Sequence, residues 1–300
     1  MFLLKKRYHN LRWRLVDICC LAYLAAIGFL LLFFHRQAPN WPLLFLIRFL
    51  SVIAVLEIIR AAAKNPAAKF FPTLRIVYPV AIILYGALEI SYTQQLFFET
   101  PWAADLLADW DKALFGTHPT VWVQQFYSPG LDELMNFFYN LYFLFIPIVL
   151  TTLLWQGKNE EALAAISIAG FTYFLNYFLF YLLPALSPRM MPWLAALHSE
   201  DFTGFFFASI TRLYQGEQGV MKGGCFPSVH VSAALSWSIA AWRYERKLGY
   251  LFFPMTLGVA VSTFYLRYHH AVDPLAGLLL GAGCSALAIR ILKKRREDPL

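Results

Sequence analysis

Long apolar runs constrain the fold of this chain more than any other feature of its sequence. An α-helix needs about 20 apolar residues to cross a bilayer, and eight segments come close to that length, the sixth being the shortest. Only 14% of the residues are charged, against about 25% in soluble domains. The sequence therefore predicts an all-α integral membrane protein with about eight transmembrane helices. These are residues 15–34, 42–63, 76–96, 131–155, 162–183, 229–242, 248–266 and 274–292.

The Lys and Arg residues of the chain are distributed as in membrane proteins. The net charge of +7 could suggest a nucleic-acid partner, but most Lys and Arg residues lie in short loops between apolar runs, where they orient membrane helices. With eight spans, every strongly basic loop falls on one face, so both termini are predicted to be cytoplasmic. We expect the membrane and a lipid substrate as partners, and no nucleic acid. The basic residues include Lys5, Arg14, Arg60, Lys64, Lys69, Arg75, Lys158, Arg243, Arg246, Lys247, Lys293 and Lys294.

Two long loops are then predicted on the outer face, which is periplasmic, extracellular or lumenal. Residues 97–130 are rich in Trp and acidic residues, which indicates an interfacial helix at the level of the lipid headgroups. Residues 184–227 form the other loop. Three polar clusters, 187–189, 223–230 and 267–273, each lie at an outer end of a span. Their convergence on one face predicts a single site there.

The residues of these clusters suit phosphate chemistry. Arginine offers paired donors that fit phosphate oxygens, and Gly and Ser at a helix start add donors where the helix dipole is positive. Two histidines from different spans can divide the work, one attacking phosphorus and one protonating the leaving oxygen. Asp273, four residues after His269, can hold an imidazole N–H. Nothing in the set requires a metal or another cofactor.

Several of these residues have simpler interpretations. Ser228 and Asp273 can act as helix N-caps, and Pro274 suits the first turn of a helix. His270 competes with His269 as the nucleophile, although the spacing to the aspartate favours His269. Arg267, like Arg189, can be an interfacial anchor that binds headgroups without chemistry.

The motifs resemble those of the type-2 phosphatidic acid phosphatase superfamily. The resemblance rests on Pro227-Ser228-x-His230 and His269-x-x-x-Asp273, with residues 187–189 as a weaker upstream element. Within the superfamily, residues 226–231 (Phe-Pro-Ser-Val-His-Val) and 111–116 (Asp-x-x-Leu-Phe-Gly) are most similar to the inositol phosphorylceramide synthase branch.

This resemblance implies roles for particular residues. His269 would attack phosphorus and form a phosphohistidine, His230 would protonate the leaving group, and Asp273 would orient His269. The phosphate would be bound by Arg189, Ser228, Gly224 and Arg267. The chain departs from the soluble phosphatases at Leu182 and Thr263, where they carry Lys and Arg.

The resemblance also implies an organisation and a reaction. A six-helix catalytic domain over residues 71–300 would follow two N-terminal transmembrane helices within residues 1–70. The expected activity is metal-independent phosphoryl transfer on a lipid phosphate or phospholipid headgroup, similar to an inositolphosphotransferase. The alternatives are a lipid phosphate phosphatase and, from another class, a lipid-binding or transport protein without catalysis.

Overall fold

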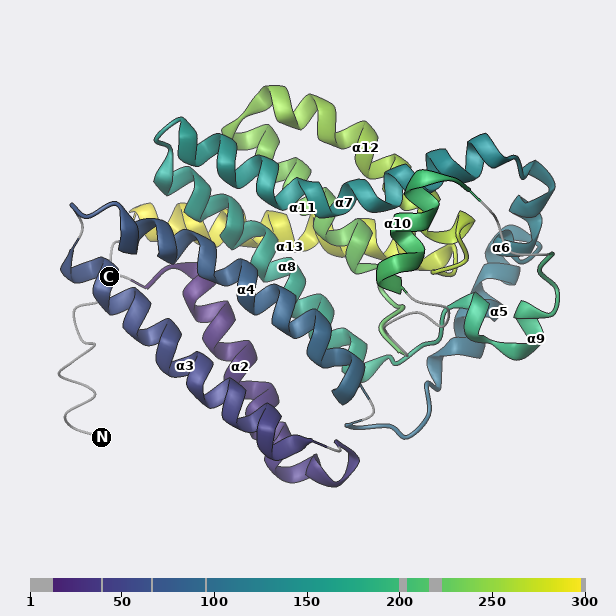
Figure 1. Cartoon of the computed structure of the whole chain (residues 1–300), viewed down its shortest axis with the longest axis horizontal. Helices are drawn as coiled ribbons and strands as arrows, with labels where there is room; N and C mark the ends of the chain where they lie inside the picture. The colour runs from purple at the N-terminus through teal and green to yellow at the C-terminus, as the bar shows by residue number, and fades with distance from the viewer. Residues whose placement is uncertain are drawn as a thin grey trace.

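The computed structural model describes residues 13–38, 40–65, 67–94, 96–199, 204–215 and 223–297, and over these ranges its regular structure is helical. Seven helices are long and apolar enough to cross a membrane, which confirms the all-α fold class (Figure 1). They are α2 (Leu15–Phe34), α3 (Trp41–Lys64), α4 (Phe70–Thr93), α7 (Pro129–Trp155), α8 (Asn159–Leu182), α12 (Arg246–Tyr265) and α13 (Val272–Glu297).

The sixth predicted span forms α11 (Val229–Tyr244), which has 16 residues. This is shorter than the run that crosses a bilayer unaided. Helix α11 packs against α7, α8, α12 and α13, and most of its residues are buried, including Ser232, Ser236 and Ser238. It is therefore an inner helix of the bundle, enclosed by the longer ones.

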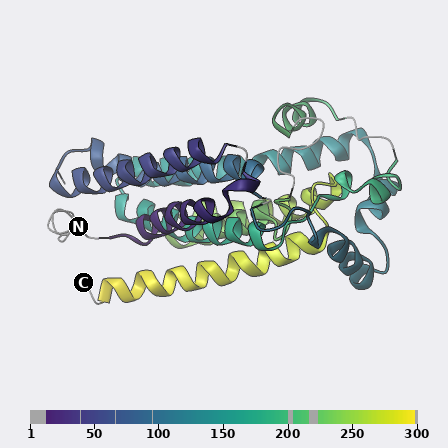
Figure 2. The same ribbon diagram turned by 90° about the horizontal axis from the view of Figure 1, so that it is seen from below.

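The N-terminal helices share the main hydrophobic core with the rest of the bundle. Helix α2 packs on α3, α4 and α8, and Figure 2 shows it between α3 and α13. A buried ion pair joins α3 to α4: the Arg48 guanidinium, 1% exposed, donates to both carboxylate oxygens of Glu89, 2% exposed. An ionisable residue at membrane depth needs such a partner, and the pair explains why Glu89 is tolerated inside an apolar run.

One end of the bundle is held by polar contacts between basic loops. Arg14 donates to Glu160 at 2.7 Å, and Lys158 pairs with Glu245 at 3.3 Å. The opposite end carries the short elements α5 (Ala103–Phe115), α6 (Pro119–Trp122), η3 (Pro188–Met190), α9 (Pro192–Ala195) and α10 (Phe206–Gln215) (Figure 1). The helix starts and ends that contain all three polar clusters lie at this second end.

The predicted interfacial helix corresponds to α5. Its Leu107 is buried, whereas Trp110, like Trp102 just before the helix, is 45% exposed. This two-sided character fits an element between protein and headgroups, although its depth in a membrane stays a prediction. The loop of residues 184–227 contains α9 and α10, which the sequence analysis did not anticipate.

Candidate active site

Glycines bring the starts of α11 and α13 into contact. A Cβ atom at Gly277 would lie 2.7 Å from the carbonyl oxygen of Ser228, and one at Gly281 would lie 2.5 Å from that of Ser232. Any larger residue would therefore push α13 away from α11. The backbone N–H of Ser228 also donates to the carbonyl oxygen of Asp273 at 3.2 Å. This close approach places the second and third polar clusters beside each other.

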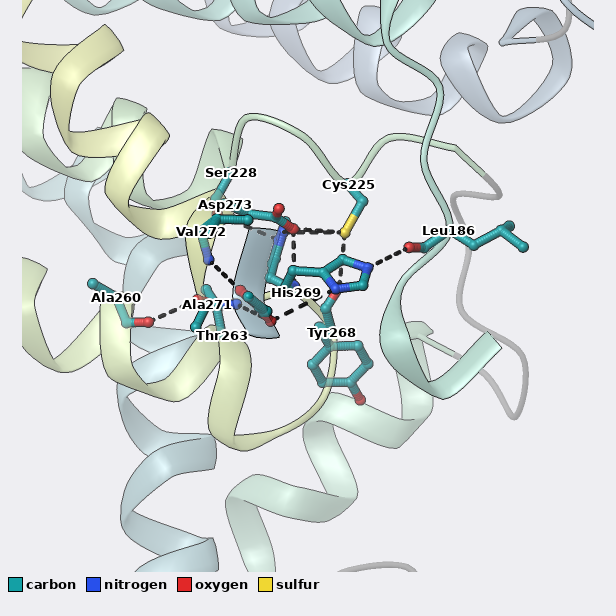
Figure 3. Close-up of polar contacts among 12 residues, drawn as sticks. Leu186, Cys225, Ser228, Ala260, Thr263, Tyr268, His269, Ala271, Val272 and Asp273 are labelled. Carbon is teal, nitrogen blue, oxygen red and sulfur yellow. Dashed lines mark hydrogen bonds and ion pairs between the residues drawn. The ribbon is translucent and has the colours of Figure 1, made fainter. Parts of the chain in front are cut away.

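A buried histidine–aspartate pair lies at this contact (Figure 3). His269 Nδ1 is 3.1 Å from Asp273 Oδ2, and the two residues are 3% and 0% exposed. Because the carboxylate accepts a hydrogen bond from the Nδ1–H group, the lone pair of the neutral imidazole lies on Nε2. Nε2 faces Ser228 Oγ at 3.3 Å. The pair thus presents a nucleophilic nitrogen at the start of α11.

Ser228 occupies the N-cap position of α11, but its side chain makes no capping hydrogen bond. The capping interpretation of its hydroxyl group was therefore wrong, because the hydroxyl contacts His269 instead. Asp273 lies inside the first turn of α13, and Oδ2 accepts from the backbone N–H of His270 at 3.0 Å. The bond ties the start of the helix to the backbone just before it, so Asp273 supports the helix start and the imidazole with the same oxygen.

His230 lies next to this pair. Its ring is 5.7 Å from the His269 ring, centroid to centroid, and stacks on Tyr139 at 4.7 Å. The residue is 8% exposed, and its Nδ1 has no hydrogen-bond partner among the described residues. Aromatic stacking therefore holds this imidazole, and the two predicted catalytic histidines lie side by side.

Arg189 is connected to His230 through two aromatic rings. Its guanidinium lies 4.7 Å from the centre of the Tyr268 ring, which stacks on Tyr139, the residue that also stacks on His230. The cation–π contact of Arg189 with Tyr268 therefore joins a fixed positive charge to the row of stacked rings that ends at His230.

The side chain of Arg267 contacts two other outer segments. The residue is 5% exposed and has a left-handed backbone, with φ of 63°. Its guanidinium donates to the carbonyl oxygen of Ser199 at 3.2 Å and approaches Gln124 Oε1 at 3.5 Å. These contacts tie together two outer segments, and phosphate binding by Arg267 stays a prediction.

Gly224 belongs to a short backbone bridge with Ala185. Beside it, the N–H of Ala185 donates to the carbonyl oxygen of Gly223 at 3.1 Å. Gly223 has φ of 131°, and a Cβ atom there would lie 2.8 Å from Gln94 Oε1, so this position requires glycine. The bridge joins the segment before Ser187 to the loop that enters α11, and so brings the first cluster to the other two.

Sequence reasoning missed the role of Asp111 in α5. Its two carboxylate oxygens accept from the backbone N–H groups of Ala271 and Val272 at 3.0 and 2.9 Å. The residue is 1% exposed. Asp111 therefore fixes the loop that carries His269, although its two bonds join residues 160 and 161 positions apart in the chain. The only sequence signal was its place in the Asp-x-x-Leu-Phe-Gly stretch.

His270 points to other partners than His269 does. Its Nε2 is 3.3 Å from the carbonyl oxygen of Leu186, and its Nδ1 is 3.7 Å from Asp111 Oδ2. Burial opposes protonation of this imidazole, but its interactions with Asp111 and Asp273 outweigh burial and raise its pKa. A raised pKa favours the imidazolium, which has no free lone pair, and Nε2 is already hydrogen-bonded to a carbonyl oxygen, so these properties favour His269 as the nucleophile.

Cys225 is an unexpected member of the site. Its thiol donates to Asp273 Oδ2 at 2.9 Å and lies 3.5 Å from His269 Nδ1. Burial and the neighbouring Asp273 raise the pKa of this thiol well above its ordinary value. Cys225, His269 and Asp273 form the one group in the described part of the chain whose ligand atoms could hold a metal ion.

The fold and the site together describe an all-helical membrane protein in which a histidine in the first turn of one helix lies beside a histidine just before another. The sequence profile of the PAP2 superfamily matches residues 105–287. Since this is more than half of the chain, the protein belongs to the PAP2 superfamily. The matched range contains all three polar clusters and Asp111.

A curated relative supports this membership. A PA-phosphatase related-family protein of Dictyostelium discoideum is 29% identical over 114 residues, which cover 38% of this chain and 21% of that protein. The match thus spans about a fifth of the length of the relative. No solved structure matches the chain.

Proposed function

We propose that the protein transfers a phosphoryl group from a lipid phosphate or a phospholipid headgroup through a phosphohistidine on His269. The observation that carries this proposal is the orientation of the imidazole: Nδ1 is held by the carboxylate of Asp273 and Nε2 faces Ser228. This is the arrangement that a nitrogen nucleophile needs, with the proton on one nitrogen and the lone pair on the other.

The proposed step follows from this geometry. Nε2 of His269 donates its lone pair to phosphorus, and the bond between phosphorus and the leaving oxygen breaks with its electron pair on that oxygen. His230 donates a proton to the leaving oxygen. The phosphate oxygens are stabilised by the guanidinium of Arg189 and by the N–H groups at the start of α11. The hydroxyl of Ser228 and the backbone near Gly224 add further donors. An acceptor hydroxyl or water then takes the phosphoryl group and restores His269.

We propose transfer to a lipid or polyol hydroxyl, as in an inositolphosphotransferase, ahead of hydrolysis. Thr263 and Leu182 stand where soluble phosphatases carry Arg and Lys. Thr263 is buried and donates to the carbonyl oxygen of Ala260 at 2.7 Å, and Leu182 is 39% exposed. Fewer cations surround the phosphate here, which suits a donor that keeps an organic substituent. Hydrolysis of a lipid phosphate is the second candidate, and lipid binding without catalysis is the third.

We also propose an orientation and a division of the chain. The concentration of Lys and Arg at the bundle end opposite the site supports a cytoplasmic location for both termini and an outer location for the site. The family match lies wholly within residues 71–300, which supports a catalytic domain over that range preceded by two helices in residues 1–70.

The test is a paired assay of the purified protein in detergent. Radiolabelled phosphatidic acid, a polyprenyl phosphate and a phosphoinositide are each supplied with and without a lipid acceptor that has a free hydroxyl. We expect a labelled protein that is stable to alkali and labile to acid, as phosphohistidine is, and a new labelled lipid when acceptor is present. Phosphate release alone would establish the phosphatase. His269→Ala protein serves as the negative control. Wild-type protein that gives neither product and no more label than this control would contradict the proposal.

A further inference from the structure

We propose that Cys225, His269 and Asp273 form a binding site for a thiophilic divalent cation, Zn²⁺, and that the bound cation switches off the nucleophile. The inhibitory part rests on the proposed function, whereas the binding part rests on geometry alone. The three ligand atoms are Cys225 Sγ, His269 Nδ1 and Asp273 Oδ2, and all lie within 4.8 Å of one another (Figure 3).

The separations between these atoms match a zinc site. Tetrahedral Zn²⁺ with bonds of about 2.3 Å to sulfur and about 2.0–2.1 Å to nitrogen and oxygen has ligand–ligand edges of about 3.3–3.6 Å. In this structure Sγ lies 3.5 Å from Nδ1 and 2.9 Å from Oδ2, and Nδ1 lies 3.1 Å from Oδ2. Hydrogen bonds now join these atoms, so the Sγ–Oδ2 separation must grow by about 0.6–0.7 Å to accommodate the cation, and the other two separations by much less.

The charges also balance. A thiolate, a carboxylate and a neutral imidazole together carry two negative charges, which neutralise the two positive charges of Zn²⁺. This matters because the three side chains are between 0% and 4% exposed, and an unbalanced charge at such a place is costly. The set leaves a fourth tetrahedral position for water or a phosphate oxygen, as in an open zinc site.

Binding would rearrange the protons without any redox change. Zn²⁺ bonds to Sγ and releases the thiol proton to solvent. It also takes the place of the proton on Nδ1 of His269, and the neutral imidazole then carries its proton on Nε2. The lone pair that would attack phosphorus is no longer available. Without a metal, Asp273 orients His269 for attack. With Zn²⁺ bound to the same side chains, His269 can no longer act as the nucleophile.

Direct metal binding is measured first, without substrate. Protein stripped with EDTA is titrated with Co²⁺, a spectroscopic substitute for Zn²⁺. We expect one equivalent to bind, with a sulfur-to-cobalt charge-transfer band in the near ultraviolet that Zn²⁺ abolishes by displacement. Cys225→Ser and Cys225→Ala should lose the band and bind Co²⁺ at least about tenfold more weakly, because the soft ligand is gone.

Cys284→Ala is the matched control, since Cys284 is a buried cysteine of α13 that is not part of the cluster. It should keep the band. Absence of the band from the wild-type protein would overturn the site even if the Cys225 variants do not fold. Persistence of the band in a folded Cys225→Ser protein would overturn it as well.

Inhibition is measured separately as phosphoenzyme formation. Saturating Zn²⁺ should lower it at least about tenfold in the wild-type protein, and EDTA should restore it. A cobalt band without any phosphoenzyme in the metal-free protein would leave the metal site standing and contradict the proposed function. Unchanged phosphoenzyme formation with one Zn²⁺ bound, or a requirement for Zn²⁺, would overturn the inhibitory role.

Discussion

Substitution of Asp273 by Asn separates the electrostatic role of this residue from its structural role. Oδ2 accepts three hydrogen bonds, from His269 Nδ1, the His270 backbone and the Cys225 thiol. Oδ1 is buried and has no hydrogen-bond partner among the described residues. An Asn side chain must therefore place its amide oxygen at the Oδ2 position, to accept from the same donors, and its NH₂ group at the Oδ1 position.

The loss of rate follows from the charge that His269 acquires. When Nε2 bonds to phosphorus, the imidazole becomes a cation beside the Asp273 carboxylate. Two unit charges about 4 Å apart attract by about 4 kcal/mol at an effective dielectric constant of about 20. Since each 1.36 kcal/mol is about a factor of ten in rate, removal of the carboxylate charge should slow phosphoenzyme formation by about 10²–10³-fold.

The structural cost is smaller and has another origin. The new NH₂ group is buried without an acceptor, which should lower the free energy of unfolding by about 1–3 kcal/mol. The capping bond to the His270 backbone survives, because an amide oxygen also accepts it. We therefore expect Asp273→Asn to fold with a modestly lower melting temperature, rather than to unfold.

The assay is quenched-flow measurement of phosphoenzyme formation at saturating lipid, with thermal unfolding in the same detergent. Asp105→Asn is the matched control. It is the same change on an exposed residue of α5 whose carboxylate accepts from the Trp193 indole, and it should behave as wild type. A folded Asp273→Asn protein whose rate stays within about threefold of wild type would refute the reasoning, because a catalytic orienting group contributes far more.

The remaining predictions concern neighbouring groups. His269→Ala should leave no phosphoenzyme in a labelling experiment, whereas His230→Ala should form it most slowly from lipids with poor leaving groups, because an acidic leaving oxygen needs less protonation. Asp111→Asn should lower the free energy of unfolding by about 1–3 kcal/mol, measured by thermal melting, because an amide can accept only one of the two backbone bonds that fix residues 271 and 272. Turnover should survive EDTA, because in the proposed mechanism Arg189 and the start of α11 supply the positive charge at the phosphate. Loss of turnover with EDTA that added Mg²⁺ restores would show that the site uses a metal.

The sequence determined most of the long helices of the bundle. The predicted span of residues 15–34 coincides with α2, and the span of residues 131–155 differs from α7 (Pro129–Trp155) by two residues at its start. The reason is that length and apolarity along a continuous segment are local properties, and a bilayer requires both. The motifs around His230 and His269 were visible for the same reason, since each lies within a few consecutive residues.

Only the tertiary structure decided which atoms meet in the site. Asp111 reaches the loop of His269 from a distant helix, and the Cys225 thiol lies against Asp273. The hydroxyl of Ser228 turns to His269 instead of capping its helix, and the guanidinium of Arg267 contacts Ser199. Each of these outcomes depends on how closely α11 and α13 approach and on where the outer loops fold back. Spacing along the chain does not contain those distances, because they are set by packing between segments that are far apart in sequence.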